Sequence, residues 1–150
     1  MSLIAYHGTA EQYVPSILRE GLKPWGAPGA DEWAAKQGNH AFLRNRREAR
    51  IYVSTEEKVA EQFAAYAADL TRTKPIVLQC KIERPELWRE DTHAEGMNAM
   101  WSREPLPPEA IAIFREVEPD TAERMVRRFN SDDRLLLGIL NMLMEGNHVR

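Results

Sequence analysis

The N-terminal stretch of the chain reads Leu3-Ile4-Ala5-Tyr6-His7-Gly8-Thr9. Its apolar beginning predicts a short strand over residues 3–7, and Gly8-Thr9 is typical of a point where the backbone turns out of a strand. Apolar residues at helical spacing follow from Val14, and Gly21 stands where a helix stops in a left-handed conformation. A strand, a turn and a short helix are therefore expected to open the fold.

Further along the chain, the pattern alternates between strands and helices. Ile51-Tyr52-Val53-Ser54 predicts a second strand, and Ser54 with Glu57 has the spacing of a capping box for a helix with an apolar face over residues 59–67. The β-branched run 76–82 predicts the strongest strand, and residues 111–114 predict the last. Helices are expected over about 119–146, so the order indicates an α+β fold.

Length and composition suit one domain over residues 1–150, with 43% hydrophobic residues and a net charge of -3. Residues 24–50 are predicted to form a long loop, either contacting substrate or solvated. The only cysteine, Cys80, lies in the strongest strand and is expected to be buried. No run of 18 apolar residues and no secretory pattern is visible, so we expect no membrane partner and a cytoplasmic location. A toxin or effector delivered into another cell would have the same composition.

Two motifs and the elements around them resemble the ADP-ribosyltransferase superfamily. They are the strand that ends in His7-Gly8-Thr9 and the later strand Tyr52-Val53-Ser54 before an alanine-rich helix. The resemblance extends from residue 5 to about residue 114. It favours the His-Tyr-acid branch of diphtheria-like toxins and poly(ADP-ribose) polymerases, because position 7 is not arginine. It implies split antiparallel β-sheets around an NAD cleft, with flanking helices and a helical C-terminus.

The resemblance implies that NAD is a substrate and that the chain is a mono-ADP-ribosyltransferase that releases nicotinamide. His7 would bond an adenosine ribose hydroxyl, and Gly8 would let the backbone approach the nicotinamide amide. Tyr52 would stack on the nicotinamide ring and take part in catalysis. Thr9 and Ser54 complete the expected NAD-binding set. The alternative is that His7 is an ordinary strand-end histidine and Tyr52 an ordinary core aromatic.

The resemblance implies a carboxylate as the third member of the site, which would stabilise the oxocarbenium-like cation formed as the glycosidic bond breaks. Asp91 is favoured, because Glu83-Arg84-Pro85 at a strand end followed by an acidic pair is similar to rifampin ADP-ribosyltransferases. Those enzymes also carry an Arg-Glu-Pro segment, as Arg103-Glu104-Pro105 does here. Glu104 is the competing candidate, as the glutamate ahead of the last strand. Glu90 and Glu95 remain weaker alternatives.

The acceptor of ADP-ribose is left open between a small molecule such as an antibiotic, a protein and a nucleic acid. The long insertion before Tyr52 and the segment Pro107-Pro108 depart from the rifampin enzymes. The Pro107-Pro108 segment looks more like other superfamily members, including toxins and tRNA 2'-phosphotransferases. The phosphotransferases need an additional basic domain, so this function is the less favoured alternative. A basic cluster offers phosphate contacts, although the net charge gives no general reason for a nucleic-acid partner. It comprises Arg44, Arg46, Arg47 and Arg50.

Two further functions compete with the transferase. One is a module that binds NAD or ADP-ribose without catalysis, and the other is an interaction domain that uses the apolar C-terminal helices. No metal is expected, because the four histidines have no metal-ligand spacing among them: His7, His40, His93 and His148.

Overall fold

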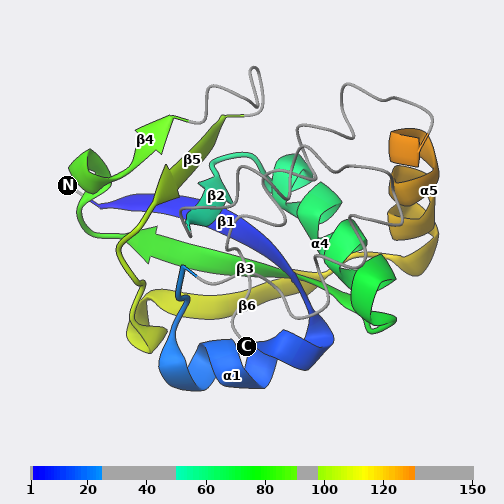
Figure 1. Cartoon of the computed structure of the whole chain (residues 1–150), viewed down its shortest axis with the longest axis horizontal. Helices are drawn as coiled ribbons and strands as arrows, with labels where there is room; N and C mark the ends of the chain where they lie inside the picture. The colour runs from blue at the N-terminus through cyan, green and yellow to red at the C-terminus, as the bar shows by residue number, and fades with distance from the viewer. Residues whose placement is uncertain (1, 25–49, 91–97, 131–150) are drawn as a thin grey trace, which may run out of the picture.

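The computed structural model describes residues 2–24, 50–90 and 98–130 (Figure 1). Its strands are β1 (Leu3–Ala10), β2 (Ile51–Ser54), β3 (Pro75–Ile82), β4 (Arg89–Glu90), β5 (Ala99–Ser102) and β6 (Ile111–Glu116). Its helices are α1 (Val14–Glu20), α4 (Glu57–Thr71) and α5 (Pro119–Asn130), with the 3-10 turns η1 (Glu11–Tyr13), η2 (Pro85–Leu87) and η3 (Pro108–Ala110). The predicted loop and the helices beyond residue 130 lie largely or wholly outside the described residues.

The strands form one antiparallel sheet in the order β4-β5-β2-β1-β3-β6 (Figure 1). This confirms the α+β class, but the described strands are joined in one sheet where split sheets were expected. The join is narrow, because β1 pairs with β2 at Tyr6 and Ser54, whereas β1 pairs with β3 along its whole length from Leu3 to Ala10. In place of two separate sheets, the described strands form one sheet with a short contact between β1 and β2, which we call the seam.

β1 is longer than the sequence predicted. Gly8, Thr9 and Ala10 continue the ladder opposite Val77, Ile76 and Pro75, so the predicted turn at Gly8-Thr9 is wrong. Glycine is required at position 8 for a different reason. A Cβ atom at Gly8 would lie 2.0 Å from the carbonyl oxygen of Ala60 and 2.4 Å from the backbone nitrogen of Ala64. Gly8 therefore lets β1 and α4 approach each other backbone to backbone.

α1 ends as predicted at Gly21, whose nitrogen donates to the carbonyl of Ile17 at 2.8 Å. The φ of Gly21 is positive, at 85°, and its ψ of 179° is that of an extended residue instead of the left-handed helical one. A Cβ there would lie 2.1 Å from the carbonyl oxygen of Leu106. Leu22 and Leu106 form an isolated bridge that ties the end of α1 to the segment before β6.

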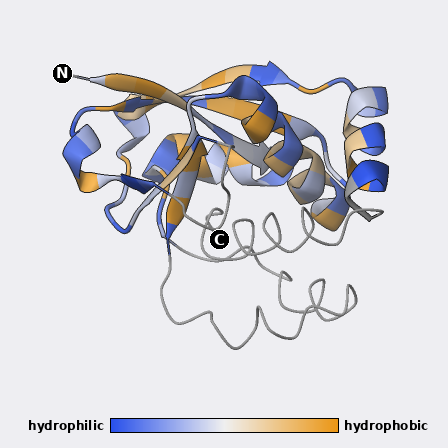
Figure 2. Ribbon diagram, turned by 90° about the horizontal axis from the view of Figure 1, so that it is seen from above, coloured by the Kyte–Doolittle hydropathy of each residue, from blue (hydrophilic) through white to orange (hydrophobic). Residues whose placement is uncertain are grey.

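α4 packs its apolar side on the sheet, as predicted. The residues expected on that side are all buried: Val59, Ala60, Phe63, Ala64 and Ala67. Figure 2 shows hydrophobic residues along the strands and on α4. The predicted capping box does not form, because the helix begins at Glu57 and the side chain of Ser54 instead accepts a hydrogen bond from the nitrogen of Glu56 at 3.0 Å.

Candidate functional site

His7 and Tyr52, 45 positions apart in sequence, are joined directly at the seam. The Nδ1 atom of His7 lies 2.8 Å from the backbone oxygen of Tyr52. A carbonyl oxygen only accepts, so Nδ1 carries the proton in this contact. In the neutral imidazole, Nε2 is then the nitrogen that can accept a hydrogen bond. The structure thus brings together two of the predicted site residues and fixes the tautomer of one.

The side chains of both residues are enclosed. His7 is 1% exposed and Tyr52 is 2% exposed, and Tyr52 belongs to the main apolar cluster of the protein. A ring stacked on Tyr52 therefore requires that side chains packed against it move. The tyrosine has the environment of a core aromatic, and its proposed contact with a ligand stays a prediction.

Thr9 and Ser54, the remaining predicted NAD-binding residues apart from Gly8, are also fully buried. Thr9 stands opposite Ile76 within the sheet, and Ser54 stands opposite Tyr6 at the seam. Ser54 holds the turn into α4 through its bond from Glu56. Ser54 therefore acts structurally here, and Thr9 occupies an interior position of the ladder.

Beside Tyr52, a cluster of arginines surrounds one tryptophan. Trp101 of β5 pairs with Tyr52 on one side and with Arg89 of β4 on the other. The guanidinium of Arg50 lies 3.9 Å from the centroid of the Trp101 ring, that of Arg89 lies 5.5 Å from it, and that of Arg103 lies 5.6 Å from it. We call these four residues the Trp101 cluster; the distances are those of cation–π contacts.

Only one residue of this cluster, Arg50, was expected from the sequence to contact a ligand. Arg50 was named among four candidate phosphate-binding arginines, whereas Arg44, Arg46 and Arg47 lie outside the described residues. Arg89 and Trp101 were not singled out, because no strand was predicted between residues 82 and 111, where β4 and β5 lie. The alternation of Trp101 and Arg103 was the one available signal, since residues two apart on a strand share a face.

Glu104, one of the two candidate acids, lines a pocket of about 290 Å³ between the end of β3 and the segment before β6. Glu83 and Arg84 line the same pocket, as do Leu87 and Trp88. Glu104 is exposed, and its nitrogen donates to the side chain of Ser102 at 3.1 Å. Glu104 and the strand end Glu83-Arg84 therefore line one pocket. Asp91 and Glu95 lie outside the described residues, and Glu90 is an exposed residue of β4.

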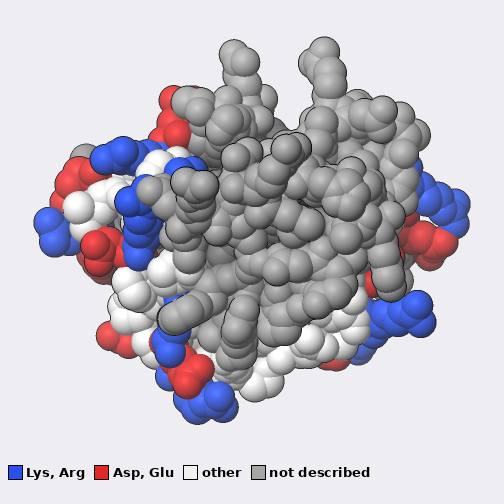
Figure 3. Space-filling view, viewed as in Figure 1, with Lys and Arg blue, Asp and Glu red and all other residues white. Residues whose placement is uncertain are grey.

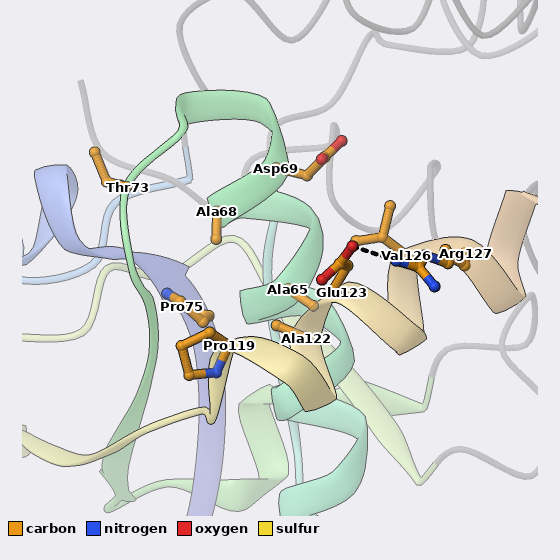
Figure 4. Close-up of a pocket in the computed structure, with 10 residues that line it drawn as sticks. All are labelled: Ala65, Ala68, Asp69, Thr73, Pro75, Pro119, Ala122, Glu123, Val126 and Arg127. Carbon is orange, nitrogen blue, oxygen red and sulfur yellow. Dashed lines mark hydrogen bonds and ion pairs between the residues drawn. The ribbon is translucent and has the colours of Figure 1, made fainter.

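A second pocket, of about 390 Å³, lies between α4 and α5 (Figure 4). Small side chains, Ala65 and Ala68 from α4 and Ala122 from α5, line it, and the ion pair of Glu123 and Arg127 stands on its α5 side. None of the predicted site residues lines this pocket. It separates two helices and is not a continuation of the seam.

Charged side chains of both signs are interspersed at the described margins of the face in Figure 3, near β4 and near α5. The described residues contain no group of three or more histidine, cysteine, aspartate or glutamate side chains that could hold a metal ion. Among those same residues, no helix has the length and apolar character needed to cross a membrane.

No protein-family model matches the chain, and no curated protein matches it. The geometry of the site and the likeness of its motifs to the ADP-ribosyltransferase superfamily are therefore the indications of function.

Proposed function

We propose that the chain is an NAD-dependent mono-ADP-ribosyltransferase. One observation carries the proposal: the contact of His7 with the backbone of Tyr52, which unites the two motifs that resemble the superfamily. His7 and Tyr52 belong to different motifs of the sequence, and in the structure they are in direct contact. Such a meeting is not needed for the α+β fold in general, because sheet strands usually join through backbone bonds alone.

The tautomer of His7 supports the role given to it. With Nδ1–H donating to Tyr52, Nε2 can accept a hydrogen bond from a ribose hydroxyl while the imidazole stays neutral. The backbone at Gly8 would bond the nicotinamide amide, and Tyr52 would stack on the nicotinamide ring. In this arrangement the seam holds the dinucleotide, and Thr9 and Ser54 keep the strands in place around it.

Transfer requires a carboxylate near the nicotinamide ribose. The bond between C1′ and the nicotinamide nitrogen breaks, its electron pair stays with nicotinamide, and Asp91 or Glu104 stabilises the developing cation. A nitrogen or oxygen of the acceptor then bonds C1′ and releases its proton to solvent. No metal takes part in this scheme.

Release of nicotinamide from NAD by the purified chain tests the proposal. Asp91→Asn and Glu104→Gln preserve the shape of each side chain, and the acid that acts should lower the rate about 100-fold or more while NAD binding is retained. Glu109→Gln, an exposed acid of η3 outside the pocket, is the matched control. A wild-type chain that releases no nicotinamide would overturn the proposal, and a melting temperature that NAD does not shift would exclude NAD binding as well.

A non-catalytic NAD-binding module is the second candidate, and the place of Glu104 favours it. Tyr52 of β2 pairs with Trp101 of β5, whereas Glu104 lies two residues beyond Ser102, the last residue of β5. Three residues of extended chain span about 10 Å, so Glu104 reaches the Tyr52 ring only if the chain bends back. This candidate predicts NAD binding by calorimetry together with no release of nicotinamide from the wild type.

A further inference from the structure

The Trp101 cluster concentrates positive charge on a chain whose net charge is -3. Its three guanidinium groups lie within 3.9 to 5.6 Å of one ring centroid, and arginine stays protonated at all ordinary pH values. Arg89 and Arg103 are exposed, and Trp101 is partly exposed. Among the described residues, no carboxylate forms an ion pair with Arg89. Arg89 and Arg103 therefore place exposed guanidinium groups beside a partly exposed aromatic ring.

This combination matches the chemistry of a nucleotide. Guanidinium groups bind phosphate oxygens through paired, charge-assisted hydrogen bonds, and an indole ring stacks on any base. Arg89 belongs to β4 and Trp101 to β5. Arg50 directly precedes β2 and Arg103 directly follows β5, and β4, β5 and β2 are neighbouring strands. Two strand spacings amount to about 10 Å, which is the scale of a single nucleotide unit.

The cluster also lies next to the proposed NAD site. Trp101 stands directly opposite Tyr52 in the antiparallel ladder, and the Cβ atoms of such a pair are about 5 Å apart on the same face. A base held on Trp101 would therefore be a neighbour of a nicotinamide held on Tyr52. The two positions have the proximity that a donor and an acceptor need.

We propose that the Trp101 cluster binds a nucleotide of a single-stranded nucleic acid and that this strand supplies the acceptor of ADP-ribose. The binding stands on the cluster alone, whereas the acceptor role rests on the proposed function. In the transfer, a nitrogen or oxygen of the bound strand bonds C1′ of the nicotinamide ribose and loses its proton to solvent, and nicotinamide leaves with the electron pair of the broken bond.

Binding of fluorescein-labelled ten-nucleotide DNA and RNA strands to the full chain, followed by anisotropy, tests the first part. Three neutralised phosphates predict a slope of about -2 for the logarithm of the binding constant against the logarithm of salt concentration. The double variant Arg89→Ala/Arg103→Ala should flatten that slope to about -0.7 and weaken binding about tenfold or more at low salt. Trp101→Ala should weaken binding about fivefold or more with the slope retained.

The matched control is Arg19→Ala/Arg124→Ala, which removes two exposed arginines from α1 and α5. Its net charge equals that of the cluster variant, so equal weakening in both would mean general electrostatic attraction and would overturn the site. No binding of either strand by the wild type at 50 mM salt would overturn it as well.

Adenosine monophosphate and NAD serve as competitors, to separate a strand from a free nucleotide. Displacement of the strand only at concentrations far above those at which NAD saturates the chain supports a separate site. If the cluster variant weakens NAD binding as much as strand binding, the cluster is part of the NAD site and the acceptor assignment is overturned.

Transfer of labelled ADP-ribose to the strand is the supporting result, and strand binding without transfer overturns the acceptor role. Nicotinamide release from NAD alone reports on the proposed function independently.

Discussion

The sheet consists of two unlike halves that meet at the seam. In the long-strand half, β1 and β3 have eight residues each and β6 has six, and α4 packs against β1 at backbone distance. In the short-strand half, β2 and β5 have four residues each and β4 has two. The long ladder and α4 contribute many of the buried apolar side chains, while the short strands carry Tyr52 and Trp101, with Arg50 and Arg103 beside their ends. Stability and binding are thus assigned to different sides of one sheet.

The largest effect on this division is expected from Gly8→Ala in the long-strand half. The added methyl would lie 2.0 Å from a backbone oxygen and 2.4 Å from a backbone nitrogen of α4, atoms that move only with the whole helix. Overpacking of a core usually costs 1–3 kcal/mol, and a clash with backbone should cost about 3 kcal/mol or more. Chemical denaturation measures this loss. A variant within about 1 kcal/mol of the wild type would mean that α4 is not fixed on β1.

The two halves also differ in how far the sequence predicted them. The long-strand half has strong local signals, since the run from Ile76 to Ile82 is apolar and β-branched and the face of α4 has helical spacing. Those elements are confirmed, as are the burial of Cys80 and the end of α1 at Gly21. The predicted turn at Gly8-Thr9 failed because close contact with α4, and not a bend, requires the glycine.

In the short-strand half, local signals are weak. β4 and β5 are short, and they become strands by pairing with each other and with β2, which is information from distant parts of the chain. Of the candidate site, the meeting of His7 with Tyr52 followed from the two motifs. The arginines around Trp101 did not, because their proximity depends on cross-strand register that no single segment of sequence contains.

The second largest effect is expected at the seam, with a set of substitutions at His7. His7→Ala leaves the buried carbonyl of Tyr52 without this donor and should cost about 1–3 kcal/mol of unfolding free energy. His7→Asn places an amide N–H near the position of Nδ1 and should recover most of that loss. His7→Gln places its amide near the position of Nε2 instead and should recover less.

The same variants separate the structural role of His7 from its proposed role toward NAD. If Nε2 receives a ribose hydroxyl, His7→Asn should be nearly as stable as the wild type and yet bind NAD about tenfold or more weakly by calorimetry. Unchanged NAD binding in His7→Asn would restrict His7 to joining the two halves of the sheet.

A smaller effect, dependent on pH, is expected at Cys80 in the long-strand half. Burial raises the pKa of this thiol from 9.0 to about 12, because the thiolate is poorly solvated in the core. Below pH 9 the thiol is protonated in both states and has no influence. Between about pH 9 and 12 the unfolded chain loses the proton and the folded chain keeps it, so stability falls as pH rises, by up to tenfold in the unfolding equilibrium per unit.

The comparison of wild type with Cys80→Ala from pH 8 to pH 11 isolates this contribution. The unfolding free energy of Cys80→Ala should fall less steeply with pH than that of the wild type. This holds even if the variant is less stable at every pH, since a cavity lowers the unfolding free energy by the same amount throughout. Burial also raises the pKa values of Tyr13 and Tyr66, which should leave a residual decline in both proteins above pH 10. Equal slopes would show that the thiol is accessible to water.

The smallest effect on stability is expected in the exposed side chains of the short-strand half. Arg89→Ala and Glu104→Gln alter exposed residues and should change the free energy of unfolding by less than about 0.5 kcal/mol. Val77→Ala, a fully buried position of β3, should cost about 1–3 kcal/mol under the same conditions. If Arg89 and Glu104 serve ligands, their substitutions change strand binding or nicotinamide release while the melting temperature stays near that of the wild type. A marked loss of stability in either variant would instead make these side chains part of the structure of the sheet, and the assignment of binding to the short strands would lose its basis.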